Sequence, residues 1–401
     1  MSENERQTGP INETELGTPL RPAQAQKTAP VPLRRVLLLA GLLAAAALVL
    51  GLLALRDRIA PARRHGTFSY AAPEEENTFR FVEGKYNAYA ALGDAFVTAA
   101  GDGLTVFDRS GTVLGAVQAA LPTPLLVTGG RMALACDAGG NRLAAIDEAG
   151  AVLLDQETEG TLLDADVSVG GAVCYAELGQ DGETLLTVLD RRQRQIYRYH
   201  SYTRYFSQCA VSEDADLLCA AALGQAGGNF ESTAVLFATD QEDPLCEVSL
   251  GSQLILDLRF LDGDTVCAVG EGSAVLFDRG GTLLGSYDYG GAALRDWRTG
   301  WDGGLLLALS PYGAGSRTEL VALDCRAAVT ARLTLEEELL SLSAAGDLCA
   351  VLTPSGLRIY DETLAQCASA GTLRAASAAV LLADGSVVLL DGGSGTRYLP
   401  E

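Results

Sequence analysis

From residue 79 to the C-terminus, short apolar runs alternate with polar turns along the chain. This is the pattern of β-strands joined by hairpins. The strongest hairpin signals are Asp-Gly pairs flanked by apolar residues: Asp102-Gly103, Asp181-Gly182, Asp262-Gly263, Asp302-Gly303 and Asp384-Gly385. After residue 56 no amphipathic helical pattern of useful length occurs, so the expected fold class is all-β.

Two stretches are near copies of each other: Val106–Gly115 (VFDRSGTVLG) and Leu276–Gly285 (LFDRGGTLLG). Each is an apolar strand ending in Asp, a short turn closed by Gly, and a second apolar strand. The two aspartates, Asp108 and Asp278, lie 170 residues apart. That distance is about four repeats of the ~40–45 residues typical of propeller blades. The repeat therefore predicts a ring of β-blades, each with three or four strands.

The strand-then-Asp signature recurs along the chain at Asp108, Asp147, Asp190, Asp240, Asp278, Asp324, Asp361 and Asp391. We therefore expect a seven- or eight-bladed β-propeller over residues 79–401. The last repeat is short, so the strand near Phe79–Val82 is expected to pair with the final blade and close the ring, which removes exposed sheet edges. A solenoid or two stacked sandwiches also have short strands, but rarely with such a regular period.

The N-terminal part of the chain has a different composition. Residues 1–33 are polar and Pro-rich, and we expect them to form a disordered cytoplasmic tail. Val36–Leu55 is an uninterrupted apolar run, long enough as a helix to cross the ~30 Å hydrocarbon core of a bilayer. A single transmembrane signal-anchor helix is therefore predicted over residues 34–56, followed by a juxtamembrane linker over residues 57–78.

Three features of the sequence bear on the orientation of this anchor. Basic residues flank the apolar run equally on both sides, so the positive-inside rule gives a tie. A short tail before one early anchor, with a large domain after it, predicts an extracytoplasmic domain. The nine cysteines (Cys136, Cys174, Cys209, Cys219, Cys246, Cys267, Cys325, Cys349 and Cys367) contain no CxxC pair and mostly lie inside apolar runs. They are expected to be small buried hydrophobic residues, which argues mildly for the cytoplasm.

The strand-Asp-x-x-Gly-x-apolar unit resembles the repeats of the quinoprotein-like (PQQ-like/WD40-like) propeller superfamily. The unit is clear at Asp108–Gly111, Asp147–Gly150 and Asp278–Gly281, whereas Asp190 and Asp324 lack the glycine. With its short tail and one anchor, the chain also resembles an uncharacterised Gram-positive membrane-anchored propeller family of unknown function. The resemblance covers residues 79–401 and implies a fold; it does not imply an activity.

Composition limits the chemistry. The formal net charge is −22, which argues against nucleic acid as a partner. Histidine occurs only at His65 and His200, too few for a multi-histidine metal site, and at most two for a conventional triad. A quinone cofactor would need stacking partners, a Ca²⁺ site and a catalytic Asp, and no matching cluster is visible. We therefore expect no catalytic residues, no cofactor and no metal; a quinone- or metal-dependent enzyme is the alternative.

Carboxylate pairs are the one feature that resembles a metal site. Asp164/Asp166, Asp214/Asp216 and Asp262/Asp264 each place two acids two residues apart. None extends into a full loop of alternating oxygen ligands for Ca²⁺, and Asp-rich turns are common in β-proteins. Structural turns are the favoured interpretation.

The most distinctive local stretch is Arg191–Phe206 (RRQRQIYRYHSYTRYF). Its alternation predicts an outer strand with tyrosines on one face. The candidate partner-binding residues are Arg191, Arg192, Arg194, Tyr197, Arg198, Tyr199, Tyr202 and Arg204. They could form a docking patch for an acidic partner or a sugar polymer, since guanidinium groups match carboxylates and tyrosine rings stack. Alternatively, the strand pairs with the domain's own acidic residues.

Two Gly-rich connections, Leu223–Ser232 and Pro311–Arg317, are expected on one rim as part of a binding surface. The sequence thus predicts a membrane-anchored, extracytoplasmic, non-catalytic propeller that binds or scaffolds at the cell surface. A protein or a cell-wall polymer is the expected partner. A cytoplasmic-facing sensor subunit is the remaining alternative, and the ligand, the oligomeric state and any cysteine pairing stay open.

Overall fold

The computed structural model describes residues 67–70, 78–226, 228–311, 317–371 and 376–401. These residues form strands, turns and loops, all within one compact unit, Ala62–Glu401. The predicted tail and transmembrane helix, and most of the predicted linker, lie outside the described residues. Within the described ranges, no helix has the length and apolar character needed to cross a membrane.

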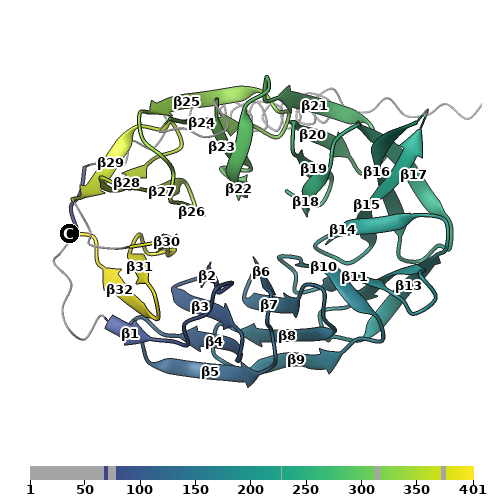
Figure 1. Ribbon diagram of the computed structural model, residues 1–401, viewed down its shortest axis with the longest axis horizontal. Coiled ribbons are helices and arrows are strands. Elements are labelled where there is room, and N and C mark those ends of the chain that lie inside the picture. The colour runs from purple at the N-terminus through teal and green to yellow at the C-terminus, as the bar shows by residue number, and fades with distance from the viewer. Residues whose placement is uncertain (1–66, 71–77, 227, 312–316, 372–375) are drawn as a thin grey trace, which may run out of the picture. The chain divides into compact units, whose positions relative to one another are not determined.

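The described strands form eight four-stranded antiparallel sheets, the blades of a propeller, arranged around a central opening (Figure 1). Blade 1 contains β2 (Ala88–Leu92), β3 (Ala95–Ala100), β4 (Gly103–Phe107) and β5 (Val113–Gln118). Blade 2 contains β6 (Pro124–Gly129), β7 (Met132–Asp137), β8 (Arg142–Asp147) and β9 (Val152–Glu157). Blade 3 contains β10 (Thr161–Val167), β11 (Val173–Leu178), β12 (Thr184–Leu189) and β13 (Gln195–Ser201). Blade 4 contains β14 (Tyr205–Val211), β15 (Leu217–Ala226), β16 (Asn229–Ala238) and β17 (Pro244–Gly251).

The second half of the ring repeats this order. Blade 5 contains β18 (Ile255–Phe260), β19 (Thr265–Gly270), β20 (Ser273–Asp278) and β21 (Leu283–Asp288). Blade 6 contains β22 (Ala293–Trp301), β23 (Gly304–Ser310), β24 (Thr318–Leu323) and β25 (Val329–Leu335). Blade 7 contains β26 (Ser341–Ala345), β27 (Leu348–Thr353), β28 (Gly356–Tyr360) and β29 (Gln366–Ala370). Blade 8 contains β30 (Ala378–Leu381), β31 (Val387–Asp391), β32 (Ser394–Tyr398) and β1 (Thr78–Arg80). Of the two predicted blade numbers, eight is therefore correct.

Blade 8 closes the ring by the expected route. β1 comes from the N-terminal side of the domain and pairs with β32 from the C-terminus, with Thr78 opposite Thr396 and Arg80 opposite Ser394. The amide of Phe81 continues the pairing by donating to the carbonyl of Gly393 at 2.9 Å. The prediction that a strand near residues 79–82 completes the last blade is confirmed.

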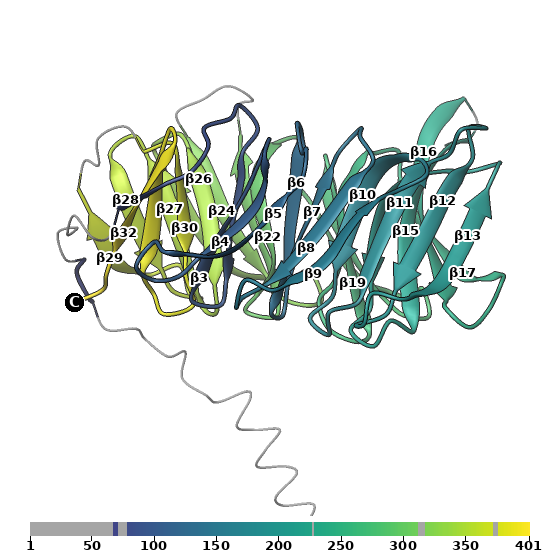
Figure 2. The ribbon, with the colours of Figure 1, turned by 90° about the horizontal axis from the view of Figure 1, so that it is seen from below.

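Antiparallel strands give the ring two distinct faces (Figure 2). The entry face carries the turns between the first and second and between the third and fourth strands of the blades. Residues 67–70 lie on this face, where the amide of Phe68 donates to the carbonyl of Cys367 and Tyr70 donates to the carbonyl of Gly385. The upper face carries the turns between second and third strands and the links from one blade to the next.

Each pair of neighbouring blades encloses its own apolar cluster, so the core consists of eight clusters around the ring. Strand β7 shows why the middle strands are apolar throughout. Its alternate residues Ala133 and Ala135 pack towards blade 1, while Leu134 and Cys136 pack towards blade 3. Because side chains alternate between two buried faces, both sets must be apolar.

The same packing explains most of the cysteines. Cys136, Cys174, Cys209, Cys219, Cys267, Cys349 and Cys367 are buried, Cys246 is half-buried, and all nine thiols are free. Cys325 alone among the nine is exposed, in the turn between β24 and β25. The prediction that most cysteines are small buried hydrophobic residues is confirmed.

The strand-then-Asp signature has a simple physical cause. In six blades the aspartate is the last residue of the third strand or directly follows it. Its Oδ1 accepts hydrogen bonds from the backbone amides two and four residues later, at 2.7–3.0 Å. The aspartates are Asp108, Asp147, Asp190, Asp278, Asp324 and Asp361. The carboxylate thereby holds the turn to the fourth strand closed on the entry face.

Two of the eight sequence hits are different. Asp240 lies two residues after the end of β16, and none of the hydrogen bonds among the described residues gives it this role. Asp391 ends the second strand of blade 8, because the fourth strand of that blade is β1 and the usual turn does not exist there. The short final spacing in the sequence reflects this shift of one strand.

Three of these six turns lack the glycine: those that begin at Asp190, Asp324 and Asp361. The fourth turn residue has a left-handed backbone in every case, with φ of +83° at Gly111 and +80° at Gly281, and +59° at Gln193 and +58° at Ala327. A side chain in this conformation is strained. In these three turns the side chain makes a contact in return. The amide of Gln193 donates to the carbonyl of Gly171 at 3.2 Å, Ala327 packs into the cluster between blades 5 and 6, and Leu364, with φ of +59°, packs into the cluster between blades 6 and 7.

We expect Asp278→Ala to destabilise the propeller by about 1–2 kcal/mol, because two backbone amides of the turn lose their acceptor. Asp278→Asn keeps an acceptor oxygen and should cost less. Asp240→Ala is the control, since it removes an aspartate from the corresponding turn of blade 4, between β16 and β17, without these two bonds. Chemical denaturation of the three variants would measure the difference; an equal loss for Asp240→Ala and Asp278→Ala would contradict this account.

Candidate functional site

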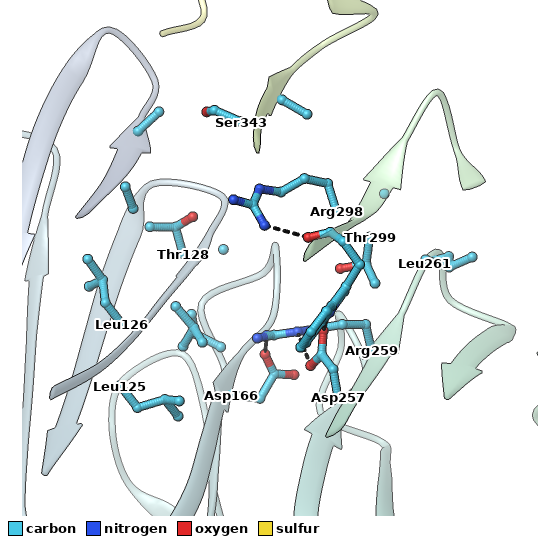
Figure 3. Close-up of a pocket in the computed structure, with 18 of the residues that line it drawn as sticks. Leu125, Leu126, Thr128, Asp166, Asp257, Arg259, Leu261, Arg298, Thr299 and Ser343 are labelled. Carbon is cyan, nitrogen blue, oxygen red and sulfur yellow. Dashed lines mark hydrogen bonds and ion pairs between the residues drawn. The ribbon is translucent and has the colours of Figure 1, made fainter. Parts of the chain in front are cut away.

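The innermost strands of all eight blades line a central cavity of about 680 Å³ (Figure 3). Its walls combine apolar side chains, such as Leu125 and Leu126, with a group of buried or half-buried charged residues. The charged residues come from blades 3, 5 and 6: Asp164, Asp166, Asp257, Arg259, Asp296 and Arg298. The chemistry of this cavity depends on how these charges are held.

A repeated irregularity places four of the polar side chains. In blades 3 to 6 the innermost strand has a register shift just before Asp164, Gln208, Asp257 and Asp296. A β-bulge changes the direction of the side chains that follow it and interrupts the ladder. The four residues therefore occupy equivalent positions in four successive blades.

Some of these side chains join one blade to the next. Asp164 accepts a hydrogen bond from the amide of Cys209 at 2.8 Å, and Asp166 accepts one from the amide of Val211 at 3.2 Å. Between blades 7 and 8, Ser343 similarly accepts one from the amide of Leu381 at 2.9 Å. The innermost strand of each blade is a sheet edge, so the amides on its unpaired side would otherwise lack partners in the protein.

Arg259 is the centre of the charged group. Its guanidinium forms an ion pair with Asp166 of blade 3, reaching past blade 4, and its Nε donates to Asp257 at 3.1 Å (Figure 3). The other oxygen of Asp257 accepts from the indole Nε1 of Trp297 at 2.8 Å. One network thus connects blades 3, 5 and 6.

A second ion pair, between Arg298 and Asp296, lies beside this network in blade 6. Arg298 contacts Asp296 at 2.5 Å and donates to the carbonyl of Leu342 in blade 7. Asp296 in turn accepts from the amide of Leu342 at 3.3 Å. These contacts tie blade 6 to blade 7 at the cavity wall.

Burial changes the acidity of two carboxyls in the cavity. It raises the pKa of Asp164 to about 6, an effect that the amide of Cys209 opposes. Burial also raises the pKa of Asp257 to about 7, although the hydrogen bond from Trp297 acts in the opposite direction. Burial lowers the pKa of Arg259 for the same reason, because the charged form is the one disfavoured away from water.

A measurable pH dependence follows. A solvated Asp titrates near pH 4, so between about pH 4 and pH 7 the folded protein binds more protons at Asp164 and Asp257 than the unfolded chain does. The free energy of unfolding from these groups therefore falls as the pH rises, by up to about 1.4 kcal/mol per pH unit for each carboxyl.

Asp164→Asn should flatten this fall between pH 4 and pH 6, since Asn still accepts from Cys209 but does not titrate. Urea denaturation at pH 4.5, 5.5 and 6.5 measures the slope. Parallel pH profiles for the two proteins would show that Asp164 does not titrate in this range.

The three carboxylate pairs noted in the sequence do not share one environment. Asp164 and Asp166 lie within strand β10, so the interpretation of this pair as a turn was wrong; the alternation and bulge of an innermost strand place both at blade contacts. Asp214/Asp216 and Asp262/Asp264 do lie at entry-face turns. In the part of the chain that the structure describes, no three His, Cys, Asp or Glu side chains are grouped to hold a metal ion.

The arginine- and tyrosine-rich candidates are divided between the two faces. Arg191, Arg192 and Arg194 lie in the entry-face turn before β13, whereas Tyr202 and Arg204 lie in the upper-face link after it. β13 runs between them as the outer strand of blade 3, as predicted. The structure does not bring the eight residues together as a single patch.

Within β13 the tyrosines and the arginine point to different sides. Tyr197 is buried and Tyr199 half-buried, and the ring of Tyr199 lies 4.7 Å from that of Phe237 in blade 4. Arg198 pairs with Glu159 at 2.9 Å and with Glu177 at 3.3 Å.

Two further arginines of the segment also form ion pairs within the domain. Arg194 pairs with Asp190 at 2.5 Å, and Arg204 pairs with Glu247 at 2.7 Å. Arg191, Arg192 and Tyr202 are exposed. The contacts of the other five candidates favour pairing within the domain.

The cavity charges outside blade 3 were missed in the sequence, although a signal was present. Asp257-Leu258-Arg259 and Asp296-Trp297-Arg298 repeat the order Asp-x-Arg at a distance of 39 residues, one blade length. Aligning the blades on their first strands, rather than on the Asp turn, would have shown this repeat.

The arrangement defines the class of protein as a WD40-like β-propeller. The C-terminal WD40 domain of Sif2 is similar in structure, with a TM-score of 0.57 and 8% sequence identity over 83% of this chain and 98% of that one. Raptor from Chaetomium thermophilum is also similar, with a TM-score of 0.51 and 11% identity; the match covers 84% of this chain but only 29% of Raptor. These likenesses show the fold alone.

Residues 67–284 match the model of a family of unknown function, DUF5711. The match covers more than half of the chain, which therefore belongs to this family. No curated protein matches the sequence. The expected resemblance to WD40-like propellers and to a propeller family of unknown function is confirmed.

Proposed function

We propose that this protein is a membrane-anchored binding or scaffolding module without catalytic activity, and that its propeller holds a protein or a cell-wall polymer outside the cytoplasm. The observation that carries the proposal is the use made of the cavity charges. Asp166, Arg259 and Asp296 hold blades to one another and to backbone amides. Groups engaged in this way are poorly placed to act as a nucleophile or as an acid–base pair, which leaves the two faces for function.

The anchor in this proposal rests on the apolar run Val36–Leu55. The described chain begins on the entry face, at residues 67–70. An anchor that precedes them would connect to the propeller through these residues.

Cys325 allows the orientation to be tested on the natural chain. It is exposed, whereas the other thiols are buried or half-buried. Intact cells that produce the full chain would be treated with a membrane-impermeant maleimide, and the protein recovered from alkali-washed membranes. We expect labelling without permeabilisation, and its loss in the Cys325→Ser variant.

Labelling only after permeabilisation would place the propeller in the cytoplasm and favour the sensor alternative. Recovery of the protein in the alkali-soluble fraction would contradict the anchor.

A further inference from the structure

One hairpin of blade 4 extends beyond the rest of its sheet. β15 and β16 have ten residues each, and β14 pairs with β15 only as far as Tyr205 opposite Leu223. β17 pairs with β16 only as far as Gly251 opposite Ser232. Three more pairs, Gly224–Glu231, Gln225–Phe230 and Ala226–Asn229, continue past both neighbours. We call these six residues the ribbon; it rises from the upper face (Figure 2).

The β16 side of the ribbon is an open strand edge. Gly251, with φ of +79°, turns the chain away at the end of β17, and the hydroxyl of Ser232 binds the carbonyl of Gln253 beyond that turn. No described strand pairs with residues 229–231 on this side. None of the six ribbon residues is a lysine or a proline, residues that commonly protect an exposed edge from pairing. The one charged residue among the six, Glu231, accepts a hydrogen bond from the hydroxyl of Ser249 at 2.6 Å.

Exposed aromatic side chains lie on the ribbon and at the base of its other edge, where β14 pairs with β15. Phe230 on the ribbon is 44% exposed, Tyr205 at the start of β14 is 40% exposed, and Tyr202 in the preceding link is 73% exposed. Aromatic residues of this kind are enriched at the centres of protein interfaces, where they bury a large area with little loss of side-chain freedom.

The charge around the ribbon is negative. Asp181 in the upper-face turn of blade 3 and Glu271 in that of blade 5 are exposed on the two flanking blades. Arg204, at the base of the ribbon, is already paired with Glu247. Carboxylates and aromatic rings together favour a partner with cationic side chains, through charge complementarity and cation–π contacts.

We propose that the ribbon binds an extended, basic segment of a partner protein, which adds as a strand along the β16 edge in line with β17. Backbone hydrogen bonds to residues 229–231 would fix the segment. Side chains alternate along β16, with Val235 and Phe237 facing blade 3 and Ala234 and Leu236 facing blade 5, so Phe230 lies on the blade 5 side. The apolar side chains of the segment would contact Phe230 there, and its alternate, cationic side chains would face Asp181 on the blade 3 side. This inference rests on the proposed binding function and adds its site and the chemistry of the partner.

The test uses the full chain in nanodiscs of neutral phosphatidylcholine, so that a basic probe is not attracted by the lipid. The probe is a fluorescent ten-residue peptide of alternating Lys and Val, and its counterpart of alternating Glu and Val is the charge control. Binding is followed by fluorescence anisotropy. We expect the Lys-Val peptide to bind and the Glu-Val peptide not to bind.

Two variants locate the site. Replacing residues 225–230 by Asn-Gly shortens the hairpin but keeps a two-residue turn that suits it, and should weaken binding at least tenfold. Phe230→Ala should weaken it about fivefold. Arg191→Ala/Arg192→Ala, on the entry face, is the matched control and should bind as the unchanged chain does.

Equal binding by the shortened chain would show general attraction to an acidic surface and overturn the site. Equal binding of the two peptides, or no binding of either peptide, would overturn the partner chemistry. A ribbon-dependent dimer in sedimentation experiments would make a second copy the occupant and overturn the proposal. None of these outcomes depends on where Cys325 is labelled, so the orientation stands or fails separately.

Discussion

Gly285→Ala is expected to lower the free energy of unfolding by about 3 kcal/mol. Gly285 lies in the outer strand β21 of blade 5, against the turn of blade 6. A Cβ at this position would lie 1.9 Å from the carbonyl oxygen of Arg326. The contact is with backbone, which cannot move aside as a flexible side chain would, so the two blades must separate.

The other near copy of the repeat provides an independent test. A Cβ at Gly115 in blade 1 would lie 2.0 Å from the carbonyl oxygen of Gly150 in blade 2. Both copies therefore end in glycine for the same reason, and Gly115→Ala should cost a similar amount.

Gly224→Ala is the matched control, because a Cβ there has only the oxygen of Glu231 within contact, at 3.8 Å. Denaturation curves of the three variants would measure the loss in the free energy of unfolding for each. A stability for Gly285→Ala equal to that of Gly224→Ala would show that the blades accommodate the methyl group.

Arg259→Met is expected to destabilise the propeller by about 3 kcal/mol. Arg259 is the cation between Asp166, which is almost fully buried, and Asp257. Removing one partner of a buried ion pair leaves the remaining charge in the protein interior without compensation, which commonly costs about 3–5 kcal/mol. Methionine keeps most of the volume, so the loss reports charge more than packing.

Two variants separate this explanation from a general effect of losing an arginine. Arg204→Met breaks a pair with Glu247 in which both side chains are more than a third exposed, and should cost under about 1 kcal/mol. Arg259→Met/Asp166→Asn removes a charge from each side and should recover part of the loss. If the double variant is less stable than Arg259→Met by the full cost of Asp166→Asn alone, the two residues are not coupled.

The fold was largely predictable because it is repeated. The strand-Asp-turn unit recurs in six of the eight blades, where its aspartate makes the same two hydrogen bonds. Periodic apolar runs gave the strands, and the short last repeat gave the closure by β1. The exact blade number was harder, because Asp391 marks a second strand and Asp240 lies two residues past the end of its strand.

The site was less predictable because it depends on contacts between blades. Asp166 and Arg259 are 93 residues apart and meet only when the ring has closed around blade 4. The arginine-rich segment shows the converse. Arg191 and Tyr202 are close in sequence, but a strand as long as β13 places them on opposite faces. Sequence proximity within a propeller therefore predicts a shared strand better than a shared surface.

The closing strand also determines how the domain would respond to tension. β1 directly follows the N-terminal segment, and only three residue pairs join it to β32. A pull on that segment would first reach the contacts of residues 67–70 and then β1 itself, before any other blade. Stripping β1 away would leave blade 8 with three strands and no chain link to blade 1. Under force, the rate at which these few contacts break would govern the lifetime of the ring. The large apolar clusters between the other blades would resist unfolding only after β1 had separated.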